Sequence, residues 1–267
     1  MAEGAAHNVE KFVVVQHSPI HGDDNSYILD AVERYPEQLR AVLWFDEEQL
    51  ELDSIEGMMH TSQRVGGAGF RIHPKPMFSS SSTWLGTPGM KRLWDVANET
   101  KQAMCCLVNP GDLAGVEAMS RANPGTPVVI DHMSRLGMAP HYGGAPDGGI
   151  VDRKEEDALL RLADLPDVTV KVSAFYALGA GRPPHLELVP RIMRLVAAFG
   201  ADRLMWGSDG PYQVFADAET KERTAAFGTY GSSIELVRDH LHDLSAEDRD
   251  QLLRGTAERV FFKNDIF

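Results

Sequence analysis

Seven short apolar runs in this chain each end in a polar side chain that is capable of chemistry. Carboxylate and imidazole groups at such positions can bind a metal ion, take a proton from water or polarise a carbonyl group. A stretch with a helical pattern follows each run, so the ends form an inventory of candidate active-site residues. They are His17, Asp46, His73, Asn109, the neighbours Asp131 and His132, Ser173, and the neighbours Ser208 and Asp209.

Two strand ends give the strongest signals. In VVIDHMSRLG, Asp131 and His132 are adjacent, so strand alternation predicts that they point to opposite faces and that one of them faces the barrel interior or its mouth. In LMWGSDGPY, Asp209 stands between two glycines and can ligate a metal or accept a proton from an attacking water. Each residue also has a purely structural alternative. Either aspartate could cap a turn, and His132 could be a histidine at the barrel rim whose hydrogen bonds are made within the protein.

The elements that position these residues follow from the same pattern. Runs rich in Val, Ile and Phe that alternate with helical stretches of about 10 to 15 residues are typical of βα units with a parallel sheet. In a (β/α)8 barrel, catalytic groups lie where each strand gives way to its loop. Seven units predict an α/β, TIM-barrel-like fold that lacks the first β-strand. We expect a gap between the strands at residues 12–17 and 203–208, whose unpaired edges favour aggregation or a homo-oligomer.

Length and composition bound the function. The 267 residues contain no linker rich in Pro, Ser or Gly, which predicts one domain over residues 1–267. The formal net charge of −13 argues against nucleic acid and anionic membranes as partners. Cys105 and Cys106 are adjacent in an apolar run, which predicts buried thiols in a reducing compartment. With no apolar leader or membrane span in the sequence, we expect a cytoplasmic protein that acts on a small molecule.

Several further residues are candidates for substrate binding. Arg71 and His73 lie two apart in GFRIHP and share a face. A bidentate arginine inside a barrel suits a substrate carboxylate, and the alternative is an internal salt bridge to Asp46 or Asp131. Lys171 shares a face with Ser173, and its alternative role is that of a core ion-pair partner.

The loops that follow the strands add four more candidates. Tyr176 is placed to reach the mouth, and Arg135 and Arg182 are free to meet an anionic substrate or to remain solvated. His17 is a candidate donor at the mouth, whereas His21 is expected to be a solvated loop histidine. An extended strand separates residues four apart by roughly 13 Å, so His17 and His21 are not expected to share one metal ion.

Taken together, these segments resemble the amidohydrolase superfamily, in particular the amidohydrolase-related (amidohydrolase 2) branch that includes dicarboxylate lactonases and aromatic-acid decarboxylases. The resemblance is carried by VVIDHMSRLG, LMWGSDGPY and LLRGTAERVF in this order, with weaker support from VVVQ, GFRIHP and VKVSAFY. It implies a distorted (β/α)8 barrel with hydrolytic or decarboxylating chemistry at the strand ends. By the same resemblance, His132 matches the strand-end histidine, and Asp209 matches the last-strand aspartate that binds metal or activates water in relatives.

The chain also departs from that pattern. Members of the branch begin with a strand ending in His-x-His, and none precedes FVVVQ here; Asn109 stands where many metal-dependent relatives have histidine. His132 and Asp209 alone would form an incomplete site for a divalent metal such as zinc or manganese. Metal-dependent and metal-independent, lactonase-like mechanisms therefore both remain open.

These observations predict an amidohydrolase-type hydrolase acting on a small, carboxylated cyclic ester (lactone) or amide. Asp209 is the expected general base and His132 the residue that polarises the carbonyl or holds a metal, while Arg71 and His73 orient the substrate. Two alternatives stay open: a metal-dependent decarboxylase of the same superfamily, and a catalytically inactive, truncated barrel that only binds a ligand or partner.

Overall fold

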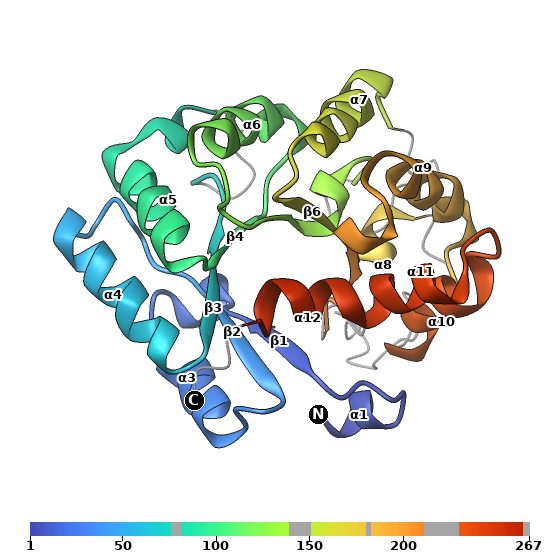
Figure 1. The fold of residues 1–267 in the computed structure, drawn as a ribbon, viewed down its shortest axis with the longest axis horizontal. Coiled ribbons are helices and arrows are strands. Elements are labelled where there is room, and N and C mark those ends of the chain that lie inside the picture. The colour runs from blue at the N-terminus through green and yellow to red at the C-terminus, as the bar shows by residue number, and fades with distance from the viewer. Residues whose placement is uncertain (76–81, 139–150, 180–182, 211–229, 264–267) are drawn as a thin grey trace, which may run out of the picture.

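The structure is a computed structural model that describes residues 1–75, 82–138, 151–179, 183–210 and 230–263. Seven parallel strands form one sheet in the order of the chain. They curl into an incomplete barrel, which confirms the seven predicted βα units (Figure 1). The strands are β1 (Phe12–Val15), β2 (Leu39–Leu43), β3 (Gly67–Ile72), β4 (Ala103–Cys106), β5 (Val128–Ile130), β6 (Val168–Val172) and β7 (Leu204–Trp206).

The longer helices lie on the outside of the curved sheet (Figure 1). Each lies close to where the sequence pattern predicts it, because apolar residues at helical spacing must face the sheet. These helices are α3 (Ser26–Arg34), α4 (Leu52–Arg64), α5 (Pro88–Thr100), α6 (Leu113–Ala122), α7 (Arg153–Arg161), α9 (Val189–Phe199) and α10 (Tyr230–His240). The shorter ones are α1 (Ala2–Ala5), α2 (Ser18–His21), α8 (Phe175–Leu178), α11 (Ala246–Asp250) and α12 (Thr256–Phe261).

Alternate residues of each strand contribute to two different apolar cores. One set packs with the outer helices and includes Phe70, Ile72 and Val170. The other set faces the barrel interior and includes Val42, Cys105, Val129 and Met205. Cys105 is fully buried in this interior cluster, and burial raises the pKa of its thiol to about 12.

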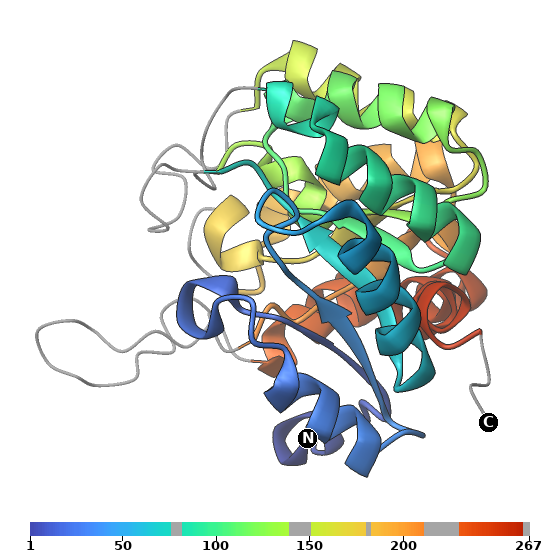
Figure 2. The same cartoon turned by 90° about the vertical axis from the view of Figure 1, so that its left-hand side faces the viewer.

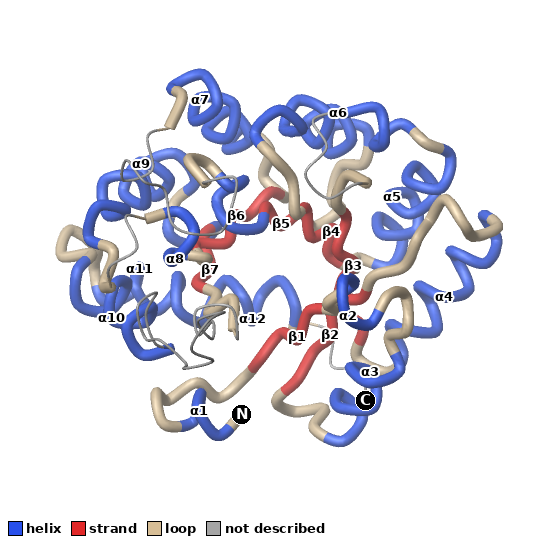
Figure 3. The backbone as a smooth tube through the Cα atoms, turned by 180° about the vertical axis from the view of Figure 1, so that it is seen from behind, coloured by secondary structure: helices blue, strands red, loops and turns tan. Residues whose placement is uncertain are grey.

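The sheet is open between β1 and β7, which do not pair with each other (Figure 3). Helix α12 lies across this side of the barrel, and its Phe261 belongs to the interior cluster. Lys11, next to β1, forms an ion pair with Glu258 of α12 at 2.9 Å. The C-terminal helix therefore fills part of the space that a neighbouring strand would occupy in a closed barrel.

The two ends of the barrel differ in what covers them. The short helices α2 and α8 follow β1 and β6, and both lie at the carboxyl end of the strands (Figure 2). We call this end the mouth, because the polar residues identified from the sequence follow the strands here. Helix α12 lies toward the other end (Figure 2). In the described part of the chain, no helix combines the length and the apolar character needed to cross a membrane.

Local signals position the helices at the mouth. Asp24 Oδ1 accepts a hydrogen bond from the backbone N–H of Ser26, the first residue of α3, at 3.0 Å. The side chain of Asn25 instead bonds the backbone of Trp44, accepting from its N–H and donating to its carbonyl oxygen. The loop after β1 is thereby tied to the end of β2.

Candidate active site at the strand ends

Four side chains at the mouth form one connected group. The Nε2 atom of His132 lies 3.6 Å from Oδ1 of Asp209. The other ring nitrogen of His132, Nδ1, lies 2.8 Å from the hydroxyl oxygen of Ser173. The hydroxyl group of Tyr176, on α8, donates to Oδ2 of Asp209 at 2.9 Å. Segments that follow β5, β6 and β7 thus bring a histidine and a carboxylate together, each held by a second polar group.

Unusual backbone geometry makes this arrangement possible. His132, Met133, Ser134 and Arg135 all have φ between 50° and 55°. Asp209 also has a positive φ, of 51°. A left-handed conformation costs roughly 1–2 kcal/mol for each L-residue, so the surrounding contacts must hold these residues in place. Such strain is concentrated at the ends of β5 and β7, beside the two candidate catalytic side chains.

The same geometry corrects one prediction. Strand alternation predicts that Asp131 and His132 point to opposite faces, but β5 ends at Ile130 and the chain then turns. Asp131 contacts Lys171, on the inward-facing side of β6, and His132 contacts Ser173, which directly follows β6. Both members of the Asp-His pair therefore reach the interior of the barrel.

A buried carboxylate holds two cations beneath this group. Asp131 is fully buried; its Oδ2 accepts from Arg71 at 2.9 Å, and its Oδ1 accepts from Lys171 at 2.5 Å. Burial acts to raise the pKa of Asp131, but Lys171 and Arg71 hold it well below the usual range. Of the partners that the sequence allowed for Arg71, the structure shows Asp131. Because two cations share one carboxylate, the group of Arg71, Lys171 and Asp131 carries a net positive charge.

Burial favours the neutral form of His132. Burial lowers its pKa, and this outweighs the opposing effect of the Asp209 and Asp131 carboxylates. Since an ionised carboxylate only accepts hydrogen bonds, the Asp209 side favours a proton on Nε2 of His132. Nδ1 then accepts the hydroxyl proton of Ser173. This tautomer presents an N–H donor to the same space that Asp209 faces.

The structure places the other predicted binding residues around the mouth. His73 stacks on Trp44, with ring centroids 5.7 Å apart, and its Nε2 lies 3.5 Å from the hydroxyl of Ser18. Burial lowers the pKa of His73 and also that of His17, on which Arg71 and Asp209 both act electrostatically. His17 therefore lies within electrostatic reach of the candidate catalytic group.

Other strand-end residues serve the scaffold. Asp46 pairs with Lys75 at 2.5 Å. Asn109 begins a short 3-10 helix and accepts from the guanidinium of Arg135 at 3.2 Å, so Arg135 is tied to the loop after β4. His21 is exposed and stacks against Tyr27. Arg182 and the polar loop at 76–81 lie outside the described residues.

Two residues at the mouth were not foreseen from the sequence. Trp44 provides the surface on which His73 stacks, and Ser18 provides the polar partner of its Nε2. An aromatic residue in the last positions of the run AVLWF was the available signal for Trp44. No comparable signal marks Ser18, because its contact depends on how α2 folds back over the end of β3.

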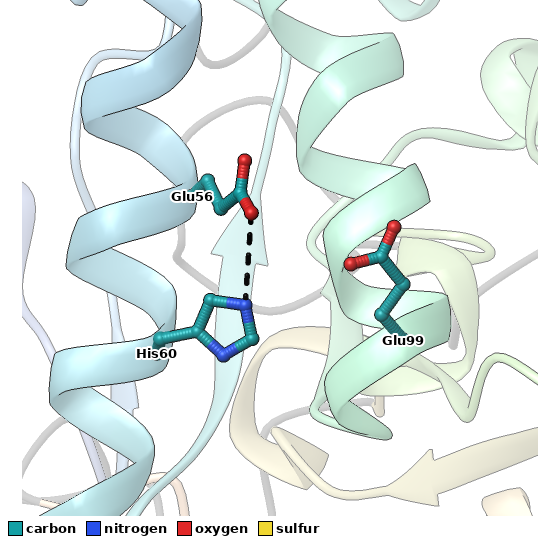
Figure 4. A group of neighbouring side chains, drawn as sticks. All are labelled: Glu56, His60 and Glu99. Atoms are coloured by element: carbon teal, nitrogen blue, oxygen red, sulfur yellow. Dashed lines mark ion pairs between the residues drawn. The ribbon is translucent and has the colours of Figure 1, made fainter.

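The described residues offer little to a metal ion at the mouth. His132 and Asp209 supply two donor atoms, but no third His, Cys, Asp or Glu of the described part of the chain joins them in a ligand group. Such a group does occur on the outer helices, where Glu56, His60 and Glu99 have ligand atoms within 4.8 Å of one another (Figure 4). Glu56 there also pairs with Arg92. This group belongs to α4 and α5 and not to the strand ends.

Comparison with known proteins identifies the family. A family model described as "Amidohydrolase" matches residues 1–263, and the chain belongs to this family. The fold and the hydrolase class predicted from the sequence are thereby confirmed.

Individual relatives and solved structures agree with this family membership. The chain is 27% identical over 228 residues to an L-fucono-1,5-lactonase of Burkholderia ambifaria, covering 85% of this chain and 71% of the relative. It is 27% identical over 254 residues to a 4-sulfomuconolactone hydrolase of Hydrogenophaga intermedia, covering 95% and 75%. A solved structure of a putative 2-pyrone-4,6-dicarboxylic acid hydrolase from Pseudomonas putida matches with 27% identity and a TM-score of 0.72, covering 99% of this chain and 86% of that one.

Proposed function

We propose that this protein hydrolyses a small lactone that carries at least one carboxylate or comparable anionic group. The observation that carries the proposal is the His132–Asp209 pair at 3.6 Å, fixed on either side by Ser173 and Tyr176. The named relatives, which are a lactonase, a sulfomuconolactone hydrolase and a putative pyrone-dicarboxylate hydrolase, support the substrate class. The match of one family model from residue 1 to 263 supports a single domain.

In the proposed reaction Asp209 is the general base. Its Oδ2 is occupied by the hydroxyl of Tyr176, which leaves Oδ1, on the side of His132, to take a proton from water. The resulting hydroxide attacks the lactone carbonyl, and the N–H at Nε2 of His132 stabilises the negative charge that develops on the carbonyl oxygen. Ring opening then needs a proton on the leaving oxygen, which the protonated Asp209 can return.

The charge of the mouth supports an anionic substrate. Arg71 and Lys171 are both slightly exposed toward the mouth and share the single carboxylate of Asp131. The low-dielectric surroundings strengthen their attraction for a carboxylate. His17, His73 and Arg135 complete the proposed binding surface.

We propose no metal-dependent step. The two donor atoms of His132 and Asp209 fall short of the three protein ligands that catalytic zinc sites use. Binding of a divalent ion such as zinc or manganese by His132 and Asp209 is a separate hypothesis. Elemental analysis of the purified protein tests it. Stoichiometric zinc or manganese would contradict the metal-independent mechanism.

The direct test is hydrolysis of a panel of lactones with and without a carboxylate. Wild type should open the carboxylated lactones with the higher kcat/KM, and Asp209→Asn should lose this activity. Asp164→Asn, which removes an exposed carboxylate from the short turn after α7, is the matched control and should keep it. Absence of hydrolysis by wild type on every lactone, with binding retained, would favour an inactive barrel. Release of carbon dioxide from an aromatic acid would favour the decarboxylase alternative.

A further inference from the structure

A concave region lies at the end of the barrel opposite the mouth. It is a cavity of about 460 Å³, within the size range of small-molecule sites, and we call it the floor cavity. Its walls are the residues that begin the strands, among them Gly67, Gln102 and Pro127, together with Phe261 at the end of α12. On β6, Thr169 lines the floor cavity, whereas Lys171, two residues further along, belongs to the mouth.

The lining of the floor cavity is unusually basic for this chain. Lys101, Arg203, Arg259 and Lys263 line it, against the two carboxylates of Asp167 and Asp202. The whole chain carries a formal net charge of −13, so a surface with more cations than anions runs against the overall composition. Four cations from three separate parts of the chain, namely the end of α5, the start of β7 and the end of α12, meet here.

The hydrogen bonds of three of these cations, Lys101, Arg203 and Arg259, go to neutral groups. Lys101 donates to Asn98 Oδ1 and to the carbonyl oxygen of Gly125, at 3.0 and 3.2 Å. Arg203 donates to three backbone carbonyl oxygens, and Arg259 also bonds a backbone carbonyl oxygen. Within the described ranges, none of the four lining cations forms an ion pair with a carboxylate. Neutral carbonyl groups fix where the cations lie but do not cancel their charge.

Backbone geometry keeps Lys101 over the cavity. Lys101 itself has φ of 59°, which directs the chain from α5 into β4, and Gly125 has φ of 82°. A Cβ atom at Gly125 would lie 3.3 Å from Nζ of Lys101, closer than the ammonium group tolerates comfortably. The turn before β5 thus leaves room for the charged end of this side chain.

We propose that the floor cavity is a second binding site, which takes a small multivalent anion such as a dicarboxylate or a phosphate. The anion would be held by Lys101, Lys263 and the free N–H groups of Arg203 and Arg259. This site is separate from the proposed lactone site and does not depend on it, because the apolar side chains of Cys105, Val129 and Met205 lie between the two ends of the barrel.

The proposal is tested by titration calorimetry of the full chain with succinate, with inorganic phosphate and with uncharged succinamide. Succinate or phosphate should bind at low salt, more weakly at high salt, and succinamide should not bind. Which of the two anions binds more tightly distinguishes a carboxylate site from a phosphate site. The double variant Lys101→Gln, Lys263→Gln should weaken binding by about fivefold or more. Lys91→Gln, which removes an exposed lysine elsewhere on α5, should leave it unchanged.

A second measurement locates the bound anion, since a carboxylate could also occupy the mouth. Mild acylation of lysines followed by mass spectrometry should show that the anion protects Lys101 and Lys263 but not Lys91. Failure of wild type to bind either anion would overturn the proposal. Unchanged affinity in the double variant, or protection that is absent at both cavity lysines, would do so as well.

Discussion

At the scale of single residues, the proposed chemistry depends on two side chains, each of which leaves one polar atom facing the other. Asp209 accepts from Tyr176 on one oxygen, and His132 bonds Ser173 through one nitrogen. The remaining oxygen and the remaining nitrogen face each other across 3.6 Å. A water molecule and a carbonyl group are the partners that such a pair of a base and an N–H donor is suited to receive.

Asp209→Asn should lower kcat of lactone hydrolysis by about 100-fold to 10,000-fold, because an amide oxygen is a poor proton acceptor. The amide still accepts from Tyr176, so the folded structure should be retained. The rate constants and the circular dichroism spectra of wild type and variant provide the measurement. Equal rates in the two proteins would remove Asp209 from the mechanism.

Ser173→Ala should lower kcat by about 10-fold, which corresponds to the loss of one neutral hydrogen bond that fixes the tautomer of His132. Ser173→Thr keeps the hydroxyl group and should restore most of the rate. The pH dependence of kcat distinguishes positioning from simple structural damage. If Ser173 positions His132, the apparent pKa on the acid limb should shift in the alanine variant and not in the threonine variant.

At the scale of secondary-structure elements, the ends of β3, β5 and β6 are held together by charge. Arg71 lies in β3, Lys171 lies in β6, and Asp131, which is fully buried, directly follows β5. Removing one partner of a buried ion pair leaves a charge without full compensation. The same residues therefore stabilise the sheet and set the charge of the proposed substrate site.

Arg71→Met should destabilise the fold by about 3 kcal/mol, at the low end for a broken buried pair because Lys171 still contacts Asp131. It should also raise KM for carboxylated lactones more than it lowers kcat, as expected when ground state and transition state share an interaction. Urea unfolding and steady-state kinetics measure the two effects. Arg121→Met, which breaks an exposed pair on α6, is the control for loss of an arginine.

Much at this scale could be predicted from the sequence. Short apolar runs located all seven strands, since a buried parallel strand needs little more than continuous apolar residues. The left-handed turn at residues 132–135 could not be predicted, because it consists of L-residues with no glycine to mark it. For the same reason strand alternation gave the wrong orientation for His132, which should have faced outward if Asp131 faced the interior. The choice of Asp131 over Asp46 as the partner of Arg71 depends on the curvature of the whole sheet.

At the scale of the whole molecule, closure of the barrel depends on a helix. The edges of β1 and β7 do not meet, and Phe261 of α12 is 4% exposed among interior residues of the strands. The inward packing of Phe261 could not be predicted, since nothing in GTAERVFF distinguishes a side chain that packs inside a barrel from one that packs outside it. The floor cavity could not be predicted either, because its lining includes residues of α12 whose packing the sequence does not reveal.

Phe261→Ala should lower the free energy of unfolding by about 3–5 kcal/mol, the usual range when a buried phenylalanine is truncated. Leu186→Ala, at a position that is 49% exposed, should change it by less than about 0.5 kcal/mol. Urea denaturation of both variants gives the comparison. Similar small losses in the two would mean that α12 does not contribute to the barrel core.

Stability should also fall when the pH drops from 7.5 to 5.5. Burial lowers the pKa of His17, His73 and His132 in the folded chain, so the unfolded chain binds more protons below about pH 6.5. The contribution of these residues is present above that pH and is lost below it, at no more than about 1.4 kcal/mol per pH unit for each histidine. Asp131 has a lowered pKa and stays ionised throughout this window.

The measurement is urea denaturation at both pH values, with His73→Gln expected to reduce the pH dependence. Burial raises the pKa of Glu47, so this residue acts in the opposite direction just above its ordinary pKa. A free energy of unfolding that is the same at pH 5.5 and 7.5 in wild type would contradict the assignment of neutral, buried histidines.

The two cysteines in the barrel wall give the molecule a built-in reporter of its own opening. Cys105 and Cys106 are the only thiols in the sequence, both are completely inaccessible, and the raised pKa of Cys105 makes its thiolate scarce in the native state. A thiol reagent can therefore react only while the strands around β4 separate. Its rate of labelling, followed without denaturant, reads out how often the barrel opens in native buffer, and it does so in any variant without a dye or an added tag.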